Sequence, residues 1–293
     1  MTSPAISSNA VIVISSHVVR GSVGNRAAVF ALETLGHPVW AVPTVILPWH
    51  PGHGAAKRIV PPVQAFDDLI ADLERAPWLG EVTGIMSGYL GNAEQAAAVA
   101  RLVRTVKAQN KNVLYLCDPV IGDEKGLYVP QATAAAIRNE LMPLADISTP
   151  NRFELAWLAE AELADNKAIM RAALHAGPAT MLVTSAHPMI AGGTGNLLIN
   201  HALALLAEHR LVSGPTNGLG DLTSALFLAR MLSGLELEQV LQRTTASVFE
   251  IMARSAKRGA DELMLEADAS SLSTPMAMVQ MRRLVHPTKG IRA

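Results

Sequence analysis

The sequence has little cysteine and no long apolar segment, and each absence excludes a class of protein. Cys117 is the single cysteine among the 293 residues, so the chain cannot form an intramolecular disulfide and suits a reducing compartment. No apolar run reaches the roughly 20 residues that a membrane-spanning helix needs. The formal net charge is only −1, which argues against nucleic acid or an anionic membrane as the main partner.

The N-terminal segment also lacks the features of a secretory signal. Residues 1–9 are small and polar, with neither a basic region nor an apolar core, so we expect a frayed terminus and a cytoplasmic protein. Half of the chain is hydrophobic, which is sufficient for one large α/β domain with a substantial core. We find no internal repeat or domain boundary and predict a single domain over residues 1–293.

Short apolar runs alternate with longer helical patterns along the chain. The short runs predict strands at residues 10–15, 39–42, 82–86, 112–117, 147–149 and 180–184. The longer patterns predict helices at residues 25–35, 64–75, 93–107, 151–159, 219–232 and 237–256. Because the strands are continuously apolar, we expect them to be buried on both faces, in a parallel sheet between two layers of helices.

Three segments depart from this alternation. Residues 44–62 are rich in proline and glycine and predict two short edge strands joined by a turn, which would protrude as a flap. Residues 197–212 predict small antiparallel strands at the other edge of the sheet. We interpret residues 260–293 as a helical C-terminal tail.

Gly218-Leu219-Gly220-Asp221 stands at the start of the predicted helix 219–232. Its two glycines permit a bend that presents backbone N–H groups at a helix N-terminus, where unpaired donors and partial positive charge suit a phosphate. A carboxylate there would repel the phosphate unless it removes a proton from the attacking group. The run therefore suggests phosphoryl transfer to a hydroxyl with Asp221 as base, the alternative being a glycine turn with Asp221 as a helix cap.

Polar residues follow other predicted strands, and in such sheets binding sites lie at the carboxyl ends of the strands. Asp118 and Asp123 follow a central strand, where paired carboxylates usually hold Mg²⁺ through water, although an Asx-Pro turn with solvated acids would place them equally well. Glu154 stands three residues after Asn151, which is a capping-box spacing. It would alternatively face metal and phosphates, because it lies at the same edge as Asp118.

The segment 16–25 begins with Ser16 at a strand end and has Gly21 and Gly24 before a helix. It resembles a dinucleotide-binding turn, but it lacks the G-x-G-x-x-G spacing and no acid ends the next strand. A small polar substrate lying over the first strand suits Ser16 better.

Five runs occur in the order typical of one family. They are S-H-V-V-R-G-S-V-G-N (16–25), S-G-Y-L-G (87–91), C-D-P-V-I-G-D (117–123), T-P-N-R-F-E (149–154) and G-L-G-D (218–221). Together they resemble the pyridoxal kinases of the ribokinase-like superfamily. The resemblance implies a three-layer α/β sandwich with a mainly parallel central sheet and a small flap at one edge. It also implies a homodimer that uses ATP and Mg²⁺, commonly with K⁺, to phosphorylate the 5′-hydroxyl of pyridoxal, pyridoxine or pyridoxamine.

The same resemblance assigns roles to residues of this chain. Asp221 would be the catalytic base, and the amides of Gly218, Leu219 and Gly220 would form an anion hole. The residues at the substrate would be Ser16, Val23, Leu47, His50, Tyr89 and Asp221. Those at the nucleotide would be Asp118, Thr149, Asn151, Glu154 and Thr184, and those at the metal would be Asp118, Asp123 and Glu154.

The chain also departs from the family pattern in its flap. The family motif is N-H-T, then one residue and Tyr, whereas this chain has Trp49-His50-Pro51-Gly52-His53. Pro51 has no donor with which to replace the threonine. Ile46 and Leu47 stand where Gln and Phe are usual. Leu219 is bulkier than the usual Thr, Val or Ala, but its backbone N–H still serves the anion hole.

Two alternatives stay open from the sequence. The first is a related kinase for another hydroxymethyl heterocycle, although pyrimidine kinases typically end this run with G-x-G-C rather than with an acid such as Asp221. The second is a vitamer-binding protein without efficient catalysis, against which Asp118, Glu154 and Asp221 all argue.

Overall fold

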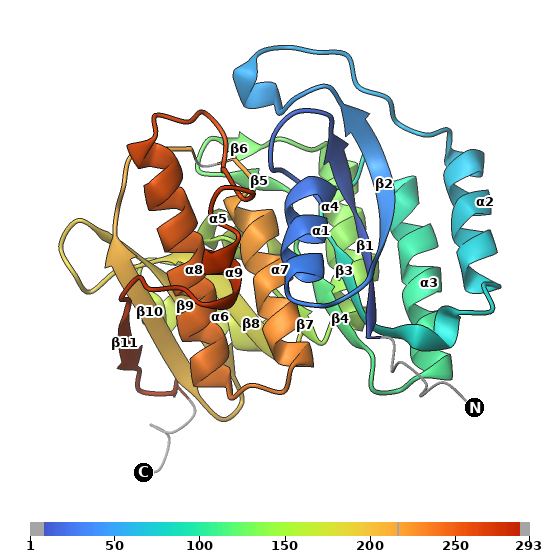
Figure 1. The fold of residues 1–293 in the computed structure, drawn as a ribbon. Helices are drawn as coiled ribbons and strands as arrows, with labels where there is room; N and C mark the ends of the chain where they lie inside the picture. The colour runs from blue at the N-terminus through green and yellow to red at the C-terminus, as the bar shows by residue number, and fades with distance from the viewer. Residues whose placement is uncertain (1–8, 216, 288–293) are drawn as a thin grey trace, which may run out of the picture.

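The computed structural model describes residues 9–215 and 217–287. A nine-stranded sheet, ordered β11-β10-β9-β8-β7-β4-β3-β1-β2, runs through the centre with helices on both faces (Figure 1). Its strands are β1 (Ala10–Val18), β2 (Val39–Leu47), β3 (Val82–Ser87), β4 (Leu114–Cys117), β7 (Ile147–Ser148), β8 (Thr180–Ala186), β9 (Gly193–Asn200), β10 (Ala204–Arg210) and β11 (Gln280–Arg283). A separate hairpin joins β5 (Gly122–Asp123) to β6 (Gly126–Leu127).

The helices lie in two layers. Those that the sequence predicts begin close to the expected residues, whereas the helices at residues 131–136 and 166–175 were not predicted. They are α1 (Asn25–Thr34), α2 (Val63–Glu74), α3 (Glu94–Gln109), α4 (Gln131–Ala136), α5 (Arg152–Ala159), α6 (Asn166–His175), α7 (Leu219–Leu232), α8 (Leu237–Lys257) and α9 (Ser270–Ser273). Short 3-10 turns are η1 (Pro51–His53), η2 (Leu79–Glu81) and η4 (Met142–Leu144), and η3 (Ile137–Leu141) is π-helical.

The strand directions confirm the predicted fold class. The strands from β2 through β1, β3, β4 and β7 to β8 pair in parallel. The pairs β8–β9, β9–β10 and β10–β11 are antiparallel, as expected for residues 197–212. The molecule is thus a three-layer sandwich whose parallel strands deliver their carboxyl ends to one edge.

Two apolar clusters hold the layers together, and strand β1 contributes to both. Val11 and Val13 pack with α1, α7 and α8 on one face, whereas Ile12 and Ile14 pack with α2, α3 and α5 on the other. Successive side chains of a strand point to opposite faces, so this alternation explains why the run is apolar at every position.

The flap, residues 44–62, differs from the prediction in one respect. Its first strand is the end of β2, which continues through Pro43 because β2 is the edge strand and needs no N–H on its outer side. Its expected second strand is reduced to one antiparallel bridge between Ile46 and Ile59. Between these lies η1 at the tip of the flap, which stands out from the sheet in Figure 1.

The expected helical tail, residues 260–293, is wrong for most of its described length. Only the four residues of α9 are helical, and β11 adds an antiparallel strand to the sheet beside β10. The short polar run Gln280–Arg283 acquires strand conformation by pairing with a distant strand, which a local pattern does not reveal. Residues 1–8, where we expected a frayed terminus, and residues 288–293 of the tail lie outside the described part of the chain.

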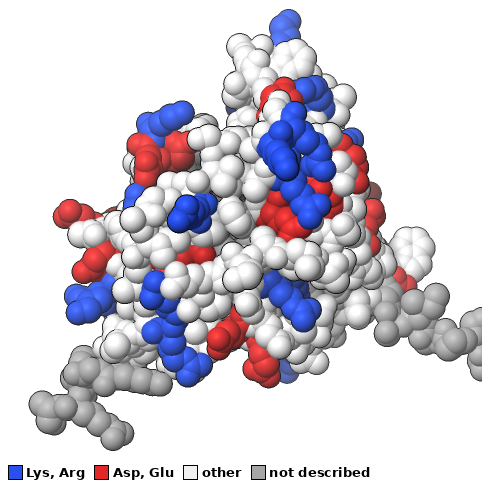
Figure 2. All heavy atoms as spheres, turned by 60° about the vertical axis from the view of Figure 1, so that its left-hand side comes forward, with Lys and Arg blue, Asp and Glu red and all other residues white. Residues whose placement is uncertain are grey.

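The surface carries charges of both signs. Over the face seen in Figure 2, basic and acidic side chains are interspersed, and large areas are uncharged. Within residues 9–215 and 217–287, no helix is both long and apolar enough to span a bilayer.

Candidate functional site

The turn before α7 is built on Gly218, as the sequence suggests. Gly218 is the N-cap residue, with a left-handed φ of 81°. A Cβ atom there would lie 2.0 Å from the carbonyl oxygen of Ser22, so no other residue fits. The first intrahelical bond runs from Leu222 N to Gly218 O, and the amides of residues 219–221 precede it. These amides form a donor-rich helix end of the kind that suits a phosphate.

Asp221 lies in the first turn of α7 and points toward the loop that follows β1. Its side chain is buried, and its Oδ2 accepts a hydrogen bond of 2.9 Å from the Gly24 N–H. Burial raises the pKa of Asp221 to about 6, against the opposing effect of the Gly24 N–H and its own backbone N–H. A carboxyl group with this pKa exchanges a proton readily near neutral pH, which suits a general base.

Asp118 follows β4 and lies beside the same turn. Its Oδ2 accepts a hydrogen bond of 2.9 Å from Ser224 Oγ, which in turn is 2.8 Å from Thr149 Oγ1. A Cβ atom on Gly220 would be 3.9 Å from Asp118 Oδ2. Burial, together with the negative charges of Glu154 and Asp221, raises the pKa of Asp118 well above its usual range.

Glu154 forms the capping box that its spacing predicts. Asn151 Oδ1 accepts the Glu154 N–H at 2.9 Å, and Glu154 Oε2 accepts the Asn151 N–H at 2.8 Å. Glu154 Oε1 also accepts the N–H groups of Ile121 and Gly122, at 3.0 and 3.4 Å. Burial raises the pKa of Glu154 to about 8 despite these backbone bonds. Glu154 therefore holds the loop that follows Asp118 through these backbone bonds. Its negative charge also raises the pKa of Asp118.

Asp123 occupies a different environment from the other two acids. It is exposed in β5 and accepts the Lys125 N–H at 2.8 Å, which matches the solvated-turn alternative. Within the described part of the chain, no group of three or more His, Cys, Asp or Glu side chains is arranged to hold a metal ion.

The donor set nevertheless fits a hydrated Mg²⁺. Mg²⁺ keeps several waters and usually takes one or two protein carboxylates plus substrate phosphates. Asp118 and Glu154 are two buried acids whose pKa values are raised first by burial and then by neighbouring negative charge, and a nearby cation would favour their charged forms. Exposure of Asp123 makes it the weakest member of the predicted metal set.

The residues predicted for the nucleotide lie along the edge formed by β4, β7 and β8. Thr149 is buried, and its hydroxyl is hydrogen-bonded to that of Ser224. Asn151 Nδ2 donates to Gly122 O at 2.8 Å. Thr184 forms a parallel bridge with Asn151, and its N–H donates to Pro150 O at 2.9 Å.

Several residues predicted for the substrate form one small cluster. Val23 and Leu47 are buried together with Val18 and Val45, and Tyr89 packs against them. The Tyr89 hydroxyl accepts a hydrogen bond of 3.0 Å from Arg58 in the flap. Strand β1, the loop after β3 and the flap thus meet in one apolar cluster, with the Tyr89 hydroxyl and Arg58 beside it.

Ser16 and His50, which are also predicted for the substrate, have different surroundings. Ser16 is buried in β1, where a Cβ on Gly24 would lie 2.4 Å from its Oγ. His50 Nδ1 accepts the Gly52 N–H at 3.0 Å, so its ring caps η1. Burial lowers the pKa of His50. The substrate contact expected of His50 stays a prediction.

Two polar groups of the site, the Ser224 hydroxyl and the Gly24 N–H, were not predicted from the sequence. Ser224 stands three residues after Asp221 on α7, and this i, i+3 spacing places it on the same helix face, which is a signal that could have been used. The Gly24 N–H that donates to Asp221 gives no such signal, because every residue except proline has a backbone N–H and the sequence does not show which one donates.

Known proteins resemble this chain over most of its length. A family model described as phosphomethylpyrimidine kinase matches residues 79–265. Pyridoxal kinase PdxY of Rubrobacter xylanophilus is 36% identical over 278 residues, which are 92% of this chain and 96% of that protein. Pyridoxal kinase PdxY of Pseudomonas paraeruginosa is 35% identical and covers 92% of this chain and 97% of its own length.

The fold also matches solved structures. Pyridoxal kinase from Leishmania donovani in complex with ADP and pyridoxamine superposes with a TM-score of 0.88. The match covers 94% of this chain and 100% of that one at 24% sequence identity.

Proposed function

The chain belongs to the pyridoxal kinase family, and we propose that it transfers the γ-phosphoryl group of ATP to the 5′-hydroxyl of pyridoxal. Pyridoxine and pyridoxamine are further acceptors under this proposal. The observation that carries it is the position of Asp221: a buried acid with a pKa of about 6 lies in the first turn of α7, beside the amides that suit a phosphate.

Asp221 is the proposed general base. Its carboxylate would accept the proton of the 5′-hydroxyl as that oxygen attacks phosphorus, while the Gly24 N–H holds the carboxylate in place. The amides of Gly218, Leu219 and Gly220 would stabilise the charge that develops on the transferred group. Positioning and electrostatics provide most of the acceleration in such reactions.

The remaining polar edge is assigned to ATP. Asp118 and Glu154 would hold Mg²⁺ through water, and the ion, when bound, neutralises phosphate charge. Thr149, Asn151 and Thr184 would line the nucleotide, and Ser224 fixes the orientation of Asp118. Asp123 is retained only as an outer member of this set.

The flap is proposed to cover the substrate and exclude water. Ser16, Val23, Leu47 and Tyr89 would surround the pyridine ring, with His50 above it. A closed flap limits transfer of the phosphoryl group to water instead of the substrate.

A pyrimidine kinase is the second candidate, because the matching family model carries the description phosphomethylpyrimidine kinase. A vitamer-binding protein without catalysis is the third. Both differ from the main proposal in a measurable product.

The test is a coupled ADP-release assay on the full chain with ATP and Mg²⁺, against pyridoxal, pyridoxine, pyridoxamine and hydroxymethylpyrimidine. We expect turnover with the vitamers and none with the pyrimidine. A parallel preparation of Asp221→Asn corrects for contaminating kinases. Turnover confined to the pyrimidine, or vitamer binding without ADP release, would overturn the proposal.

The assembly and setting are part of the same proposal. We infer a cytoplasmic homodimer that uses K⁺ as well as Mg²⁺, on the resemblance of the five motif runs and the single cysteine, Cys117. Sedimentation analysis tests the homodimer, and turnover with and without K⁺ tests the K⁺ requirement.

A further inference from the structure

Glu262 is a buried acid that no assignment above uses. It lies in the C-terminal turn, residues 260–264, and only 8% of its surface is exposed. Its Oε1 is 2.6 Å from Nε2 of His53, at the tip of the flap. Its Oε2 accepts the Ser22 N–H at 3.4 Å. One carboxylate thus contacts two segments that are 209 and 240 residues away in the sequence.

The loop after β1 is shaped to receive this carboxylate. We call residues 20–24 the substrate loop. A Cβ atom on Gly21 would lie 2.7 Å from the carboxyl carbon of Glu262, so the acid occupies the space that a side chain would take. The Ser22 hydroxyl donates to Leu263 O at 2.8 Å, which fastens the same loop to the same turn.

The substrate loop also contacts the candidate catalytic turn. Ser22 O is the atom that a Cβ on Gly218 would approach to 2.0 Å. Two residues later, the Gly24 N–H donates to Asp221. A short, tightly packed loop therefore connects Glu262 on one side with the proposed base on the other.

The flap tip also lies close to the candidate catalytic turn. A Cβ on Gly52 would be 3.5 Å from Asn217 Nδ2, next to Gly218. Gly52 and His53 therefore place the flap tip near the turn, and the His53–Glu262 hydrogen bond anchors it.

A second ion pair lies nearby but is much more exposed. Arg20 and Asp261 approach to 2.8 Å with side chains 56% and 59% exposed, whereas the side chains of His53 and Glu262 are 22% and 10% exposed. Exposed pairs contribute little because water screens them. The contact of Glu262 is therefore expected to stabilise the flap more than the ion pair of Asp261 does.

From these contacts we propose that Glu262 is a positioning residue that holds the closed flap and the substrate loop in one arrangement. The proposal rests on the proposed kinase function for its consequence. When the Glu262–His53 contact is lost, the flap opens more often, so the alcohol substrate binds more weakly and water reaches the phosphoryl group. ATP, whose proposed site lies along β4, β7 and β8, is bound as before.

The test compares Glu262→Gln and His53→Gln with Glu266→Gln, an exposed acid of the same segment. Loss of one partly buried, charge-assisted hydrogen bond should raise the KM for pyridoxal about tenfold and leave the KM for ATP within about twofold. The fraction of ADP formed without phosphorylated vitamer should rise in both variants. The double variant should be only slightly worse than either single variant, since the His53–Glu262 contact is lost in all three. Glu266→Gln should resemble the wild type.

A second measurement follows the flap without any activity. Lys57 and Arg58 are exposed flap residues, and trypsin cleavage there, followed by mass spectrometry, reports flap opening. Cleavage at Arg75, an exposed residue at the end of α2, serves as the internal reference. The ratio of flap cleavage to Arg75 cleavage should increase several-fold in Glu262→Gln and His53→Gln, by the same loss of contact.

The outcomes separate this proposal from the kinase assignment. An unchanged cleavage ratio overturns the positioning role whether or not the protein is a kinase. Equal increases in the KM for both substrates, with a lowered Tm, indicate a merely structural acid and also overturn it. Absence of vitamer turnover in the wild type contradicts the proposed function alone, because the cleavage ratio still tests the flap contact.

Discussion

Two groups of buried carboxylates in this molecule have opposite electrostatic surroundings. The sheet-edge acids are Asp118, Glu154 and Asp221, whose pKa values are all raised by burial. The C-terminal acids are Glu250 and Asp268, whose pKa values are both lowered. Both groups are at most 9% exposed, so burial alone does not explain the difference.

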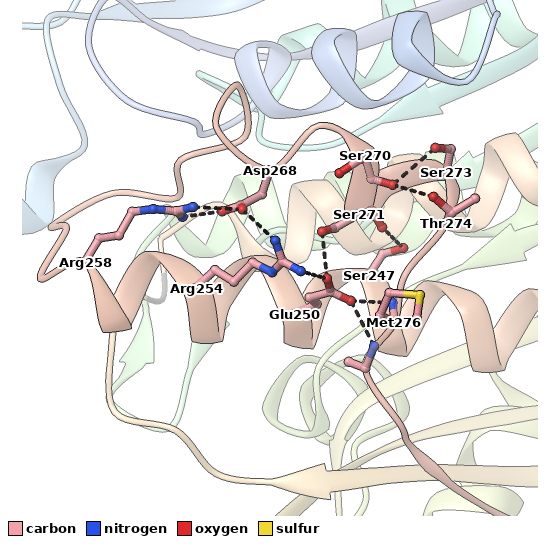
Figure 3. Close-up of polar contacts among 11 residues, drawn as sticks. Ser247, Glu250, Arg254, Arg258, Asp268, Ser270, Ser271, Ser273, Thr274 and Met276 are labelled. Atoms are coloured by element: carbon pink, nitrogen blue, oxygen red, sulfur yellow. Dashed lines mark hydrogen bonds and ion pairs between the residues drawn. The ribbon is translucent and has the colours of Figure 1, made fainter.

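The C-terminal acids are compensated by partners on α8 and the following segment (Figure 3). Arg258 and Arg254 point toward Asp268. Burial by itself raises the pKa of Glu250, but the Ala277 and Met276 N–H groups, the Ser271 hydroxyl and Arg254 together outweigh it. These acids fasten the C-terminal segment to α8.

The sheet-edge acids have neutral donors instead, and the charges acting on Asp118 are those of Glu154 and Asp221. Uncompensated negative charge in a buried site is costly. A site that retains it is suited to binding a cation or moving a proton. The contrast teaches that the depth of burial and the available partners, rather than residue type, distinguish the proposed working acids from those that stabilise the fold.

The two groups also respond oppositely to pH. The folded protein binds protons to the sheet-edge acids more tightly than the unfolded chain, so their contribution to stability declines as pH rises from about 4 toward 8. The C-terminal acids have lowered pKa values, so their contribution is present above about pH 4 and is lost as pH falls further.

The largest expected effect comes from exchanging one acid of each group. Asp221→Asn should lower kcat about 10²–10⁴-fold, the usual contribution of a general base, with a smaller effect on ATP binding. Asp268→Asn, a buried acid of the other group, should leave kcat of the folded protein unchanged. Steady-state kinetics at saturating pyridoxal and ATP measure both, and near-wild-type turnover by Asp221→Asn would remove the proposed base.

Asp118→Asn should separate activity from stability. The amide keeps an acceptor for Ser224 Oγ but removes a buried charge, so the ligand-free Tm at pH 8 should rise. Activity should fall roughly 10–100-fold, as when a metal site loses a supporting group. Thermal unfolding and the ADP-release assay measure the two effects. A lowered Tm would mean that the Asp118 charge is compensated after all.

Glu250→Gln should give the smallest effect. In contrast to Asp118→Asn, it should lower stability and leave activity unchanged. The substitution weakens hydrogen bonds from the Met276 and Ala277 N–H groups, now 2.6 and 2.9 Å long, and the pairing with Arg254. We expect the free energy of unfolding to fall by about 1–3 kcal/mol with kcat and both KM values unchanged. Denaturant unfolding and steady-state kinetics provide the readouts, and a selective loss of kcat would contradict the division into two groups.

Much of the fold follows from local patterns. Helix α7 occupies residues 219–232, as the glycine turn and the apolar run predict, because both its start signal and its core face are local. The parallel strands were predicted because each is buried on both faces and therefore continuously apolar. The capping box at Asn151 and Glu154 was likewise visible in the sequence, because the two residues are three positions apart.

Helices α4 and α6 and the β5–β6 hairpin are local elements that were missed, but the other features that escaped prediction depend on distant partners. Strand β11 exists because Gln280–Arg283 pairs with β10, and the flap return is a single bridge rather than a strand. Glu262 contacts His53 and Ser22 only in the folded chain. In the candidate site, residue types could be predicted, whereas the surroundings that raise or lower each pKa could not.

The most direct test of the difference between the two acid groups is the pH dependence of kcat/KM at saturating MgATP, measured with pyridoxal and pyridoxine. A buried base with the raised pKa of Asp221, about 6, predicts a fall of about tenfold per pH unit below that value and a plateau above it. The profile should be the same for both vitamers, since the titrating group belongs to the protein. A rate constant that stays level down to pH 5, in protein that remains folded there, would contradict the account.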